Sequence, residues 1–475
     1  MNRPNPWLSR HTEAAVVPRF GRAVALTSVS TLVAMLAYSG PLGNAPTLAA
    51  SFSASAGGRT WILSSMSVGL AVTLLSVGAL ADDYGRRRVF AVGAWVFVAG
   101  SAVCAVANGS TLFVLGRLVE GAGAAGVVAT GLGLVAAASG HAGHRAAAAS
   151  WWGASMGAGI ALGPVLTGLL DLGQKWRLFY WLLVAAGAGI AVAASRLFTE
   201  SETVAARRVD VAGLASMTGG LGLLLVALIE VRRGAQNLAA VGGVLAVVLL
   251  VGFVVTQLRG RAAMLDPALF RRRDFVAATI AALATGGGVI ALMSFAATFL
   301  VTAMGMTTLG AGGLLAVWSA TSAASAIAGR WLPRRLAGNG QLVTGLAGVG
   351  IGMLLLTALS TASTPLRLVP GLLLAGLASG ILNAGLGRQA VASAPPERAA
   401  LGTGTNNTAR YVGSSIGVTI VSVIAADPTG TRAGLVTGWN HASAITAAVS
   451  LAGAVTVGVL VRSRTRQRPP EGNGR

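Results

Sequence analysis

The sequence predicts an all-α polytopic membrane protein that crosses the bilayer about fourteen times. First, 54% of its 475 residues are hydrophobic and only 10% are charged, whereas about 25% of residues are charged in a typical soluble domain. Second, the mean hydropathy is +0.73. Third, apolar stretches of about 20 residues recur along the chain, separated by short basic connections.

We expect each apolar stretch to form a helix, because lipid leaves the backbone to satisfy its own hydrogen bonds and a β-barrel would show alternating polarity instead. The expected spans are residues 22–41, 61–81, 89–107, 111–137, 146–170, 177–195, 210–230, 238–257, 275–303, 308–332, 341–360, 366–388, 401–425 and 441–461. Arginine and lysine gather in cytoplasmic loops, and most of them fall on one side here if both termini are cytoplasmic. That alternation supports an even number of spans.

Two longer polar connections, at residues 196–210 and 258–275, divide the spans into groups of six, two and six. The expected parts are a cytoplasmic N-terminal tail at 1–21, an N-terminal six-helix bundle at 22–195, two linker helices with cytoplasmic connections at 196–274, a C-terminal six-helix bundle at 275–461 and a basic cytoplasmic tail at 462–475. A faint repeat relates the halves, because GRWLPRRLAG and GALADDYGRR each follow the second span of a six-helix group. Repeated halves around a central site are a common plan of transporters.

The segment GALADDYGRRRVF concentrates charge in one short turn between the second and third spans. Glycine permits a tight turn there, and an acid can face the N-terminus of a neighbouring helix. The segment resembles the signature loop of the major facilitator superfamily, whose acid and arginines latch the two halves on the cytoplasmic side and release during transport. The resemblance assigns this latch to Gly78, Asp82, Gly85, Arg86 and Arg87. Asp83 departs from the family, which often has a basic residue there; a charged turn that only sets orientation is the alternative.

The fourth expected span contains GRLVEGAGAAG, which resembles the second motif of the same superfamily. A buried arginine is expensive in hydrocarbon, so Arg117 needs a partner. Glu120 lies three residues further on, and residues at that spacing share a helix face. The family more often has glutamine at this position. Two interpretations stay open: Glu120 takes up and releases protons beside Arg117, or the two form a static ion pair.

The fifth expected span contains GAGIALGPVLTG, which resembles the motif of the antiporter branch of the superfamily. Its signature residues here are Gly159, Gly163, Pro164 and Gly168. Proline interrupts the helical hydrogen bonds and glycine lets a neighbouring helix approach closely, which gives a bend that a rocking half can use. The resemblance implies export driven by a counter-moving cation. Helix packing alone is the alternative, and Thr167 replaces a further glycine of the family's tighter motif.

Three further stretches, WILSS, WRLFYW and LDPALFRRRDF, together with PPERAALGTGTNNTARYVGSSIG, make residues 22–461 similar to the 14-helix drug:proton antiporter family. The resemblance implies a major facilitator fold of 6+2+6 transmembrane helices, with inverted repeats in two pseudo-symmetric halves, in the inner or cytoplasmic membrane. Members commonly carry an acid in the first helix, but Ala37 occupies that position here. Pro41, Gly43 and Pro46 are expected to loosen this helix, with a simple helix end as the alternative.

The central cavity should suit a neutral or anionic amphipathic compound, because acids are scarce and uncharged or basic groups are better represented near the later spans. Candidate cavity residues are Tyr38, Asn44, Trp151, Trp152, Phe295, Phe299, Trp318, Asn383, Asn406, Asn407 and Arg410. For each aromatic side chain, lipid-facing or interfacial packing is the alternative.

These features predict a secondary active transporter, with proton-coupled efflux of a small drug, antibiotic or secondary metabolite by alternating access. Uptake or exchange on the same fold is the alternative, and a non-transporting membrane sensor is a third. The chain carries no Walker loop, no HExxH and no nucleophile–base pair, so we expect no enzyme, cofactor or metal. The net charge of +21 lies in short clusters between spans, so nucleic acid is not an expected partner. The expected partners are the lipid bilayer, protons and the substrate, with the protein as a monomer.

Overall fold

The computed structural model describes residues 6–137, 142–173, 175–198, 210–232, 234–259, 267–329, 338–395, 398–425 and 431–465. All regular secondary structure in these ranges is helical. Thirteen helices there are long and apolar enough to cross a membrane, and a shorter apolar helix, Asn339–Leu355, lies where the eleventh span was expected. The predicted all-α polytopic class, with about fourteen spans, is confirmed.

The N-terminal helices are α1 (Pro6–Ser39), α2 (Pro41–Ser51), α3 (Ala56–Tyr84), α4 (Arg86–Val106), α5 (Ser110–Ala137), α6 (Ala142–Asp171) and α7 (Trp176–Leu197). Two further helices follow, α8 (Val211–Arg232) and α9 (Gln236–Arg259). The remaining elements are η1 (Pro267–Arg271), α10 (Arg273–Thr285), η2 (Gly286–Ile290), α11 (Ala291–Thr302), α12 (Thr308–Ala328), α13 (Asn339–Leu355), η5 (Pro365–Leu368), α14 (Val369–Ala392), α15 (Ala399–Ala425) and α16 (Arg432–Thr465).

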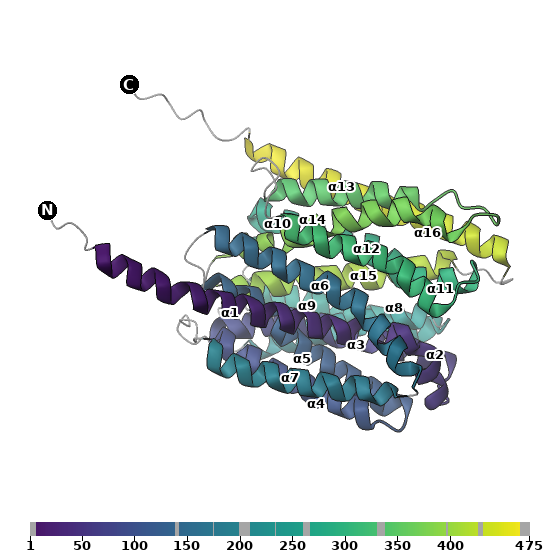
Figure 1. The fold of residues 1–475 in the computed structure, drawn as a ribbon, viewed down its shortest axis with the longest axis horizontal. Coiled ribbons are helices and arrows are strands. Elements are labelled where there is room, and N and C mark those ends of the chain that lie inside the picture. The colour runs from purple at the N-terminus through teal and green to yellow at the C-terminus, as the bar shows by residue number, and fades with distance from the viewer. Residues whose placement is uncertain are drawn as a thin grey trace.

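The long helices run side by side in an elongated bundle, with α1 to α7 below and α10 to α16 above in the view of Figure 1. We call these two groups the N-terminal half and the C-terminal half. Helix α6 lies against α12 and α14 of the other half, and α3 lies against α15. The start of α1 and the end of α16 lie at the same end of the bundle (Figure 1), which we call the terminal end. The two halves therefore meet along α3, α6, α12, α14 and α15.

Each half has its own large buried apolar cluster, one around Met66, Phe97 and Phe113 and the other around Leu346 and Trp439. Helix α6 bridges them, because its half-buried Ile160 packs against both clusters. Separate buried clusters allow each half to move as a unit.

The first expected span breaks near its end. Helix α1 begins at Pro6, within the segment expected to be a tail, and ends at Ser39. The chain then enters the short helix α2 with Pro41 at its start, and Asn44 has non-helical φ and ψ angles of −136° and 24°. Proline cannot donate the backbone hydrogen bond that would continue α1. The predicted loosening around Pro41 is therefore present as a discrete break, which we call the α1–α2 break.

The ninth expected span also departs from a single regular helix, because a π-helical turn, η2, separates α10 from α11. Three consecutive glycines, Gly286 to Gly288, begin this turn. A Cβ atom on Gly286 would lie only 1.9 Å from the Arg410 carbonyl oxygen, and one on Gly413 would lie 2.2 Å from the Leu283 carbonyl oxygen. Glycine thus permits direct backbone contact between this turn and α15. Such turns occur frequently at functional sites.

Candidate functional site

The turn between α3 and α4 joins the two halves at the terminal end. Gly85 forms the turn with a φ of 107°, a conformation that disfavours other residues. The Asp82 carboxylate accepts hydrogen bonds from the backbone N–H groups of Ala400 (3.1 Å) and Leu401 (2.8 Å), in the first turn of α15. It also accepts from Arg86 Nε at 3.0 Å. First-turn N–H groups have no partner within their own helix, so the carboxylate satisfies them and complements the helix dipole.

Asp83 adds a second bond between the halves, because its Oδ1 lies 2.8 Å from Arg398 Nη1. A Cβ atom on Gly78 would lie 2.7 Å from the Ala400 carbonyl oxygen, so this glycine permits the close approach of α15. Arg87 instead donates to the Ser195 carbonyl oxygen of α7, within the N-terminal half. We call the cross-half contacts of Asp82 and Asp83 the terminal latch. Arg398 was not identified as a partner from the sequence. Pro333, in the related segment GRWLPRRLAG of the C-terminal half, lies outside the described residues.

Arg117 and Glu120 form the predicted pair inside the N-terminal half, where both are fully buried. Arg117 Nη1 lies 2.5 Å from Glu120 Oε2, and Ser101 of α4 donates to Glu120 Oε1 at 2.7 Å. Arg117 also donates to the carbonyl oxygens of Ala37 (2.8 Å) and Tyr38 (3.4 Å), in the last turn of α1. Carbonyls at a helix end have no partner in their own helix. The pair therefore holds the end of α1 just before the α1–α2 break.

The antiporter motif on α6 packs against the other side of the same break. A Cβ atom on Gly163 would lie 2.1 Å from Ser39 Oγ, and one on Gly159 would lie 2.5 Å from the Leu32 carbonyl oxygen. Ser39 Oγ donates to the Gly159 carbonyl oxygen at 3.3 Å. Gly168 has only a loose contact, at 3.8 Å from the Gly43 carbonyl oxygen. The first two glycines thus set the close contact between α1 and α6.

Thr167 contributes a contact that a glycine would not make. Its hydroxyl donates to the Gly40 carbonyl oxygen at 2.6 Å. Pro164 lies within α6, and its carbonyl oxygen would lie 2.1 Å from a Cβ atom on Gly43. Arg117 and Thr167 therefore satisfy carbonyls on both sides of Ser39. A change at either motif acts on the same short stretch of backbone.

Several predicted cavity residues meet where the halves are in contact. The rings of Tyr38 on α1 and Tyr411 on α15 lie 5.8 Å apart. Arg410 Nη1 donates to Met156 Sδ of α6 at 2.7 Å. The ring of Trp152, also on α6, would lie 3.1 Å from a Cβ atom on Gly387 of α14.

Asn383 of α14 lies near the same contact, beside Gly153 of α6. The Asn407 amide instead donates to the Thr403 carbonyl oxygen within α15. The contacts of Tyr38, Arg410, Trp152 and Asn383 join the two halves, so the structure represents a conformation closed at this level.

Other candidates lie away from this contact. Trp151 is 45% exposed, although its neighbour Trp152 is buried. Phe299 stacks on Trp439 with ring centroids 4.3 Å apart, inside the C-terminal cluster. Phe295 packs against that cluster too. The cavity role of Trp151, Phe295 and Phe299 stays a prediction.

For three further candidates, the structure gives no contact between the two halves. Trp318 Nε1 donates to Ser379 Oγ at 3.3 Å, and Asn406 Nδ2 donates to the Ala278 carbonyl oxygen at 2.9 Å, both within the C-terminal half. Asn44 is buried at the α1–α2 break. These contacts give each residue a packing role in the present conformation.

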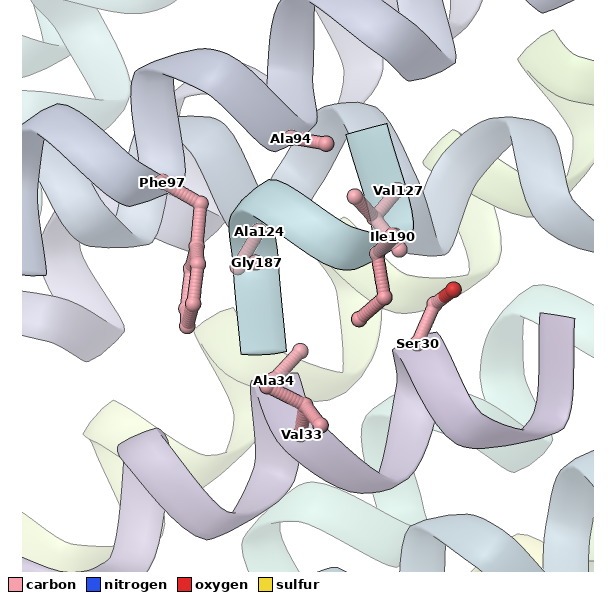
Figure 2. Close-up of a pocket in the computed structure, with 9 residues that line it drawn as sticks. All are labelled: Ser30, Val33, Ala34, Ala94, Phe97, Ala124, Val127, Gly187 and Ile190. Atoms are coloured by element: carbon pink, nitrogen blue, oxygen red, sulfur yellow. The ribbon is translucent and has the colours of Figure 1, made fainter. Parts of the chain in front are cut away.

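A small hollow of about 10 Å³ lies within the N-terminal half, away from the contact between halves. Its lining comes from α1, α4, α5 and α7 (Figure 2), and Ser30 is the one polar side chain among the labelled residues. The Ser30 hydroxyl is already bonded to the Leu26 carbonyl oxygen. Binding sites for drug-sized molecules are usually about 300–1,000 Å³ with several polar groups. We therefore do not assign the substrate to this hollow.

Glu230 on α8 is a further buried carboxylate, besides Asp82 and Glu120, and sequence reasoning overlooked it. Trp61 Nε1 of α3 donates to its Oε1 at 3.4 Å. The residue lies at the very end of the expected span 210–230, which is why only Glu120 stood out in the sequence. Glu230 offers a comparison acid for any test of Glu120.

Comparison with known proteins agrees with these features. The family model described as Major Facilitator Superfamily matches residues 27–418. A probable actinorhodin transporter of Streptomyces coelicolor is 32% identical over 80% of this chain and 68% of its own. Multidrug resistance protein Stp of Mycobacterium tuberculosis is 31% identical, over 80% and 71% respectively. Puromycin resistance protein pur8 of Streptomyces alboniger is 29% identical, over 87% and 86%.

Two solved structures share the fold. The human organic anion transporter MFSD10 aligns with a TM-score of 0.69 and 17% identity, over 92% of this chain and 99% of that one. The proton:xylose symporter XylE aligns with a TM-score of 0.69 and 12% identity, over 94% and 96%. At these identities the likeness concerns the fold alone.

Proposed function

The chain belongs to the major facilitator superfamily, and from this premise we propose that it is a proton-coupled exporter of a small amphipathic drug, antibiotic or secondary metabolite. Relatives named for antibiotic transport and multidrug resistance support the drug-efflux class. The observation that carries the proposal is the terminal latch, in which Asp82 of one half binds two backbone N–H groups of the other. Such a contact closes one end of the pathway and can be broken and remade.

In the proposed orientation the terminal end faces the cytoplasm, because most basic residues of the sequence fall on that side. The protein then acts as a monomer in the cell membrane, with both termini cytoplasmic. The present conformation is closed to the cytoplasm by the terminal latch. A hydrogen bond to a charged group contributes about 1.5–3 kcal/mol, so these few contacts hold the closed state while still allowing it to open.

Proton coupling is proposed to use Glu120. Adding a proton to its carboxylate removes the counter-charge of Arg117 in a fully buried site, and an uncompensated buried charge is strongly destabilising. Arg117 also holds the carbonyls of Ala37 and Tyr38, so the proton acts directly on the α1–α2 break. Motion of this break reaches α6 through Ser39 and Thr167. One proton enters as the substrate leaves, and its release to the cytoplasm restores the ion pair.

Everted membrane vesicles test the direction of transport. Respiration acidifies their lumen, so an exporter is expected to accumulate its compound inside in exchange for protons. Neutral and anionic aromatic antibiotics are suitable probes, since relatives are named for antibiotic transport and resistance. Accumulation should require the protein and disappear with a protonophore. Saturable uptake by whole cells with no accumulation in everted vesicles would instead establish the alternative, uptake or exchange, which the missing acid at Ala37 favours.

Pro164→Ala is expected to slow turnover more than it changes substrate affinity. Alanine restores the helical hydrogen bond that proline lacks, so α6 should become stiffer where Pro164 packs against the α1–α2 break. Transport rates and binding constants measured on the same preparation separate the two effects. Leu162→Ala is the matched control, because this neighbour is 49% exposed on the same helix. A change confined to affinity would place Pro164 in the substrate site instead.

A further inference from the structure

Arg410 is a buried cation to which no described residue supplies a counter-charge. Only 2% of the residue is exposed, and Nη1 donates to Met156 Sδ, a weak and neutral acceptor. Its Nε and Nη2 atoms are buried and make no hydrogen bond with any described residue. The ion pairs found in the described ranges use other arginines. The guanidinium therefore lies at the contact between the halves with most of its bonding capacity unused.

Arg117 shows how this chain stabilises a buried arginine with partners from the protein itself. Both arginines are almost completely buried, but Arg117 has a carboxylate and two backbone carbonyls as partners. Removing a charge from water without pairing it is strongly unfavourable. The charge of Arg410 is consequently a stability defect in the closed protein, and a bound anion would remove it.

A second buried donor with no described partner lies on α6, the helix that contacts Arg410. Trp152 lies four residues before Met156 on α6 and so shares its helix face. The Trp152 indole N–H is buried and has no acceptor among the described residues. One donor group on each half, Arg410 and Trp152, thus has no acceptor among the described residues. The aromatic pair Tyr38 and Tyr411 lies nearby, because Tyr411 is close enough to Arg410 for an electrostatic interaction.

We propose that Arg410 binds an oxyanion of the transported compound, which makes the substrate class an aromatic organic acid. The acid group pairs with the free edge of the guanidinium, and Tyr38 and Tyr411 contact the aromatic body. A carboxylate or sulfonate matches the fork of N–H groups on arginine in a two-point contact. This inference rests on the proposed transport function, and it narrows the expected neutral or anionic substrate to the anion.

Binding to the full-length protein in detergent tests the proposal. The probes are 2-naphthoate and anthraquinone-2-carboxylate, each compared with its neutral carboxamide, with dissociation constants from calorimetry. The acids are expected to bind at least about tenfold more tightly than the amides, as charge-assisted hydrogen bonds imply. Arg410→Gln should abolish this preference, and Arg410→Lys should keep part of it. Absence of acid binding, equal binding of acid and amide, or an unchanged preference in Arg410→Gln would overturn the proposal.

Stability without ligand gives a second readout. Arg410→Met removes an unpaired buried charge, so its thermal unfolding midpoint should equal or exceed that of the wild type. Arg117→Met, the matched control, should lower the midpoint because it leaves Glu120 unpaired. An equal loss in both variants would show that Arg410 is structural. Because binding is measured without a gradient, intact acid preference with no proton-driven export would contradict the proposed function and leave this inference standing.

Discussion

Asp82→Asn is expected to lower the transport rate by at least about tenfold while the amount of protein in the membrane stays unchanged. The carboxylate accepts from Arg86, Ala400 and Leu401 at once. Asparagine keeps the size but has one acceptor oxygen, and its NH₂ group would face an N–H donor. Loss of one charge-assisted bond of about 1.5–3 kcal/mol corresponds to about a tenfold to hundredfold shift in the closed population.

Initial rates in vesicles with matched protein amounts give the measurement. Asp83→Asn provides the internal control, because the Asp83–Arg398 pair is partly exposed and such pairs contribute only about 0–1 kcal/mol. Its rate should fall much less. Equal flux for Asp82→Asn and wild type would show that the turn sets orientation and does not latch the halves.

Glu120→Gln is expected to abolish export driven by a pH gradient while sparing substrate binding and substrate exchange. Glutamine keeps a hydrogen-bonding partner for Ser101 and Arg117 but cannot exchange a proton. The cycle then lacks the change in charge that moves the α1–α2 break. Binding constants, counterflow and gradient-driven transport are compared on one preparation.

Glu230→Gln serves as the matched control for a second buried acid, and its coupling should be retained. Full gradient-driven export by Glu120→Gln would make the Arg117–Glu120 pair structural. If only Glu230→Gln lost proton-coupled export, the proton site would be assigned to α8 instead.

The fold was predictable because long apolar stretches and basic connections reflect the bilayer itself. The family model and the solved structures confirm the predicted superfamily and fold, and the relatives agree with the predicted class of secondary transporter. Contact between Arg117 and Glu120 was predictable too, because a spacing of three residues fixes it locally. The division into six, two and six helices stays a prediction, as do the roles of the individual site residues.

Contacts between distant segments could not be predicted from the sequence. Asp83 and Arg398 are 315 positions apart, and no local pattern marks them as partners. Trp151 and Trp152 are adjacent, yet one is 45% exposed and the other 1%. A membrane helix that is apolar all round gives no periodic signal for the face that meets another helix. The π-helical turn at Gly286 had only the run of glycines as its signal.

Substrate-driven proton movement in proteoliposomes tests the central claim most directly. Vesicles containing a trapped pH indicator are loaded with a compound that binds the purified protein and has no titratable group near neutral pH. They are then diluted into compound-free buffer at the same pH. Proton-coupled antiport predicts that the lumen becomes acidic as the compound leaves, only with active protein, and that Glu120→Gln eliminates this signal. Outward movement of the compound with no change in luminal pH, or with alkalinisation, would contradict proton antiport.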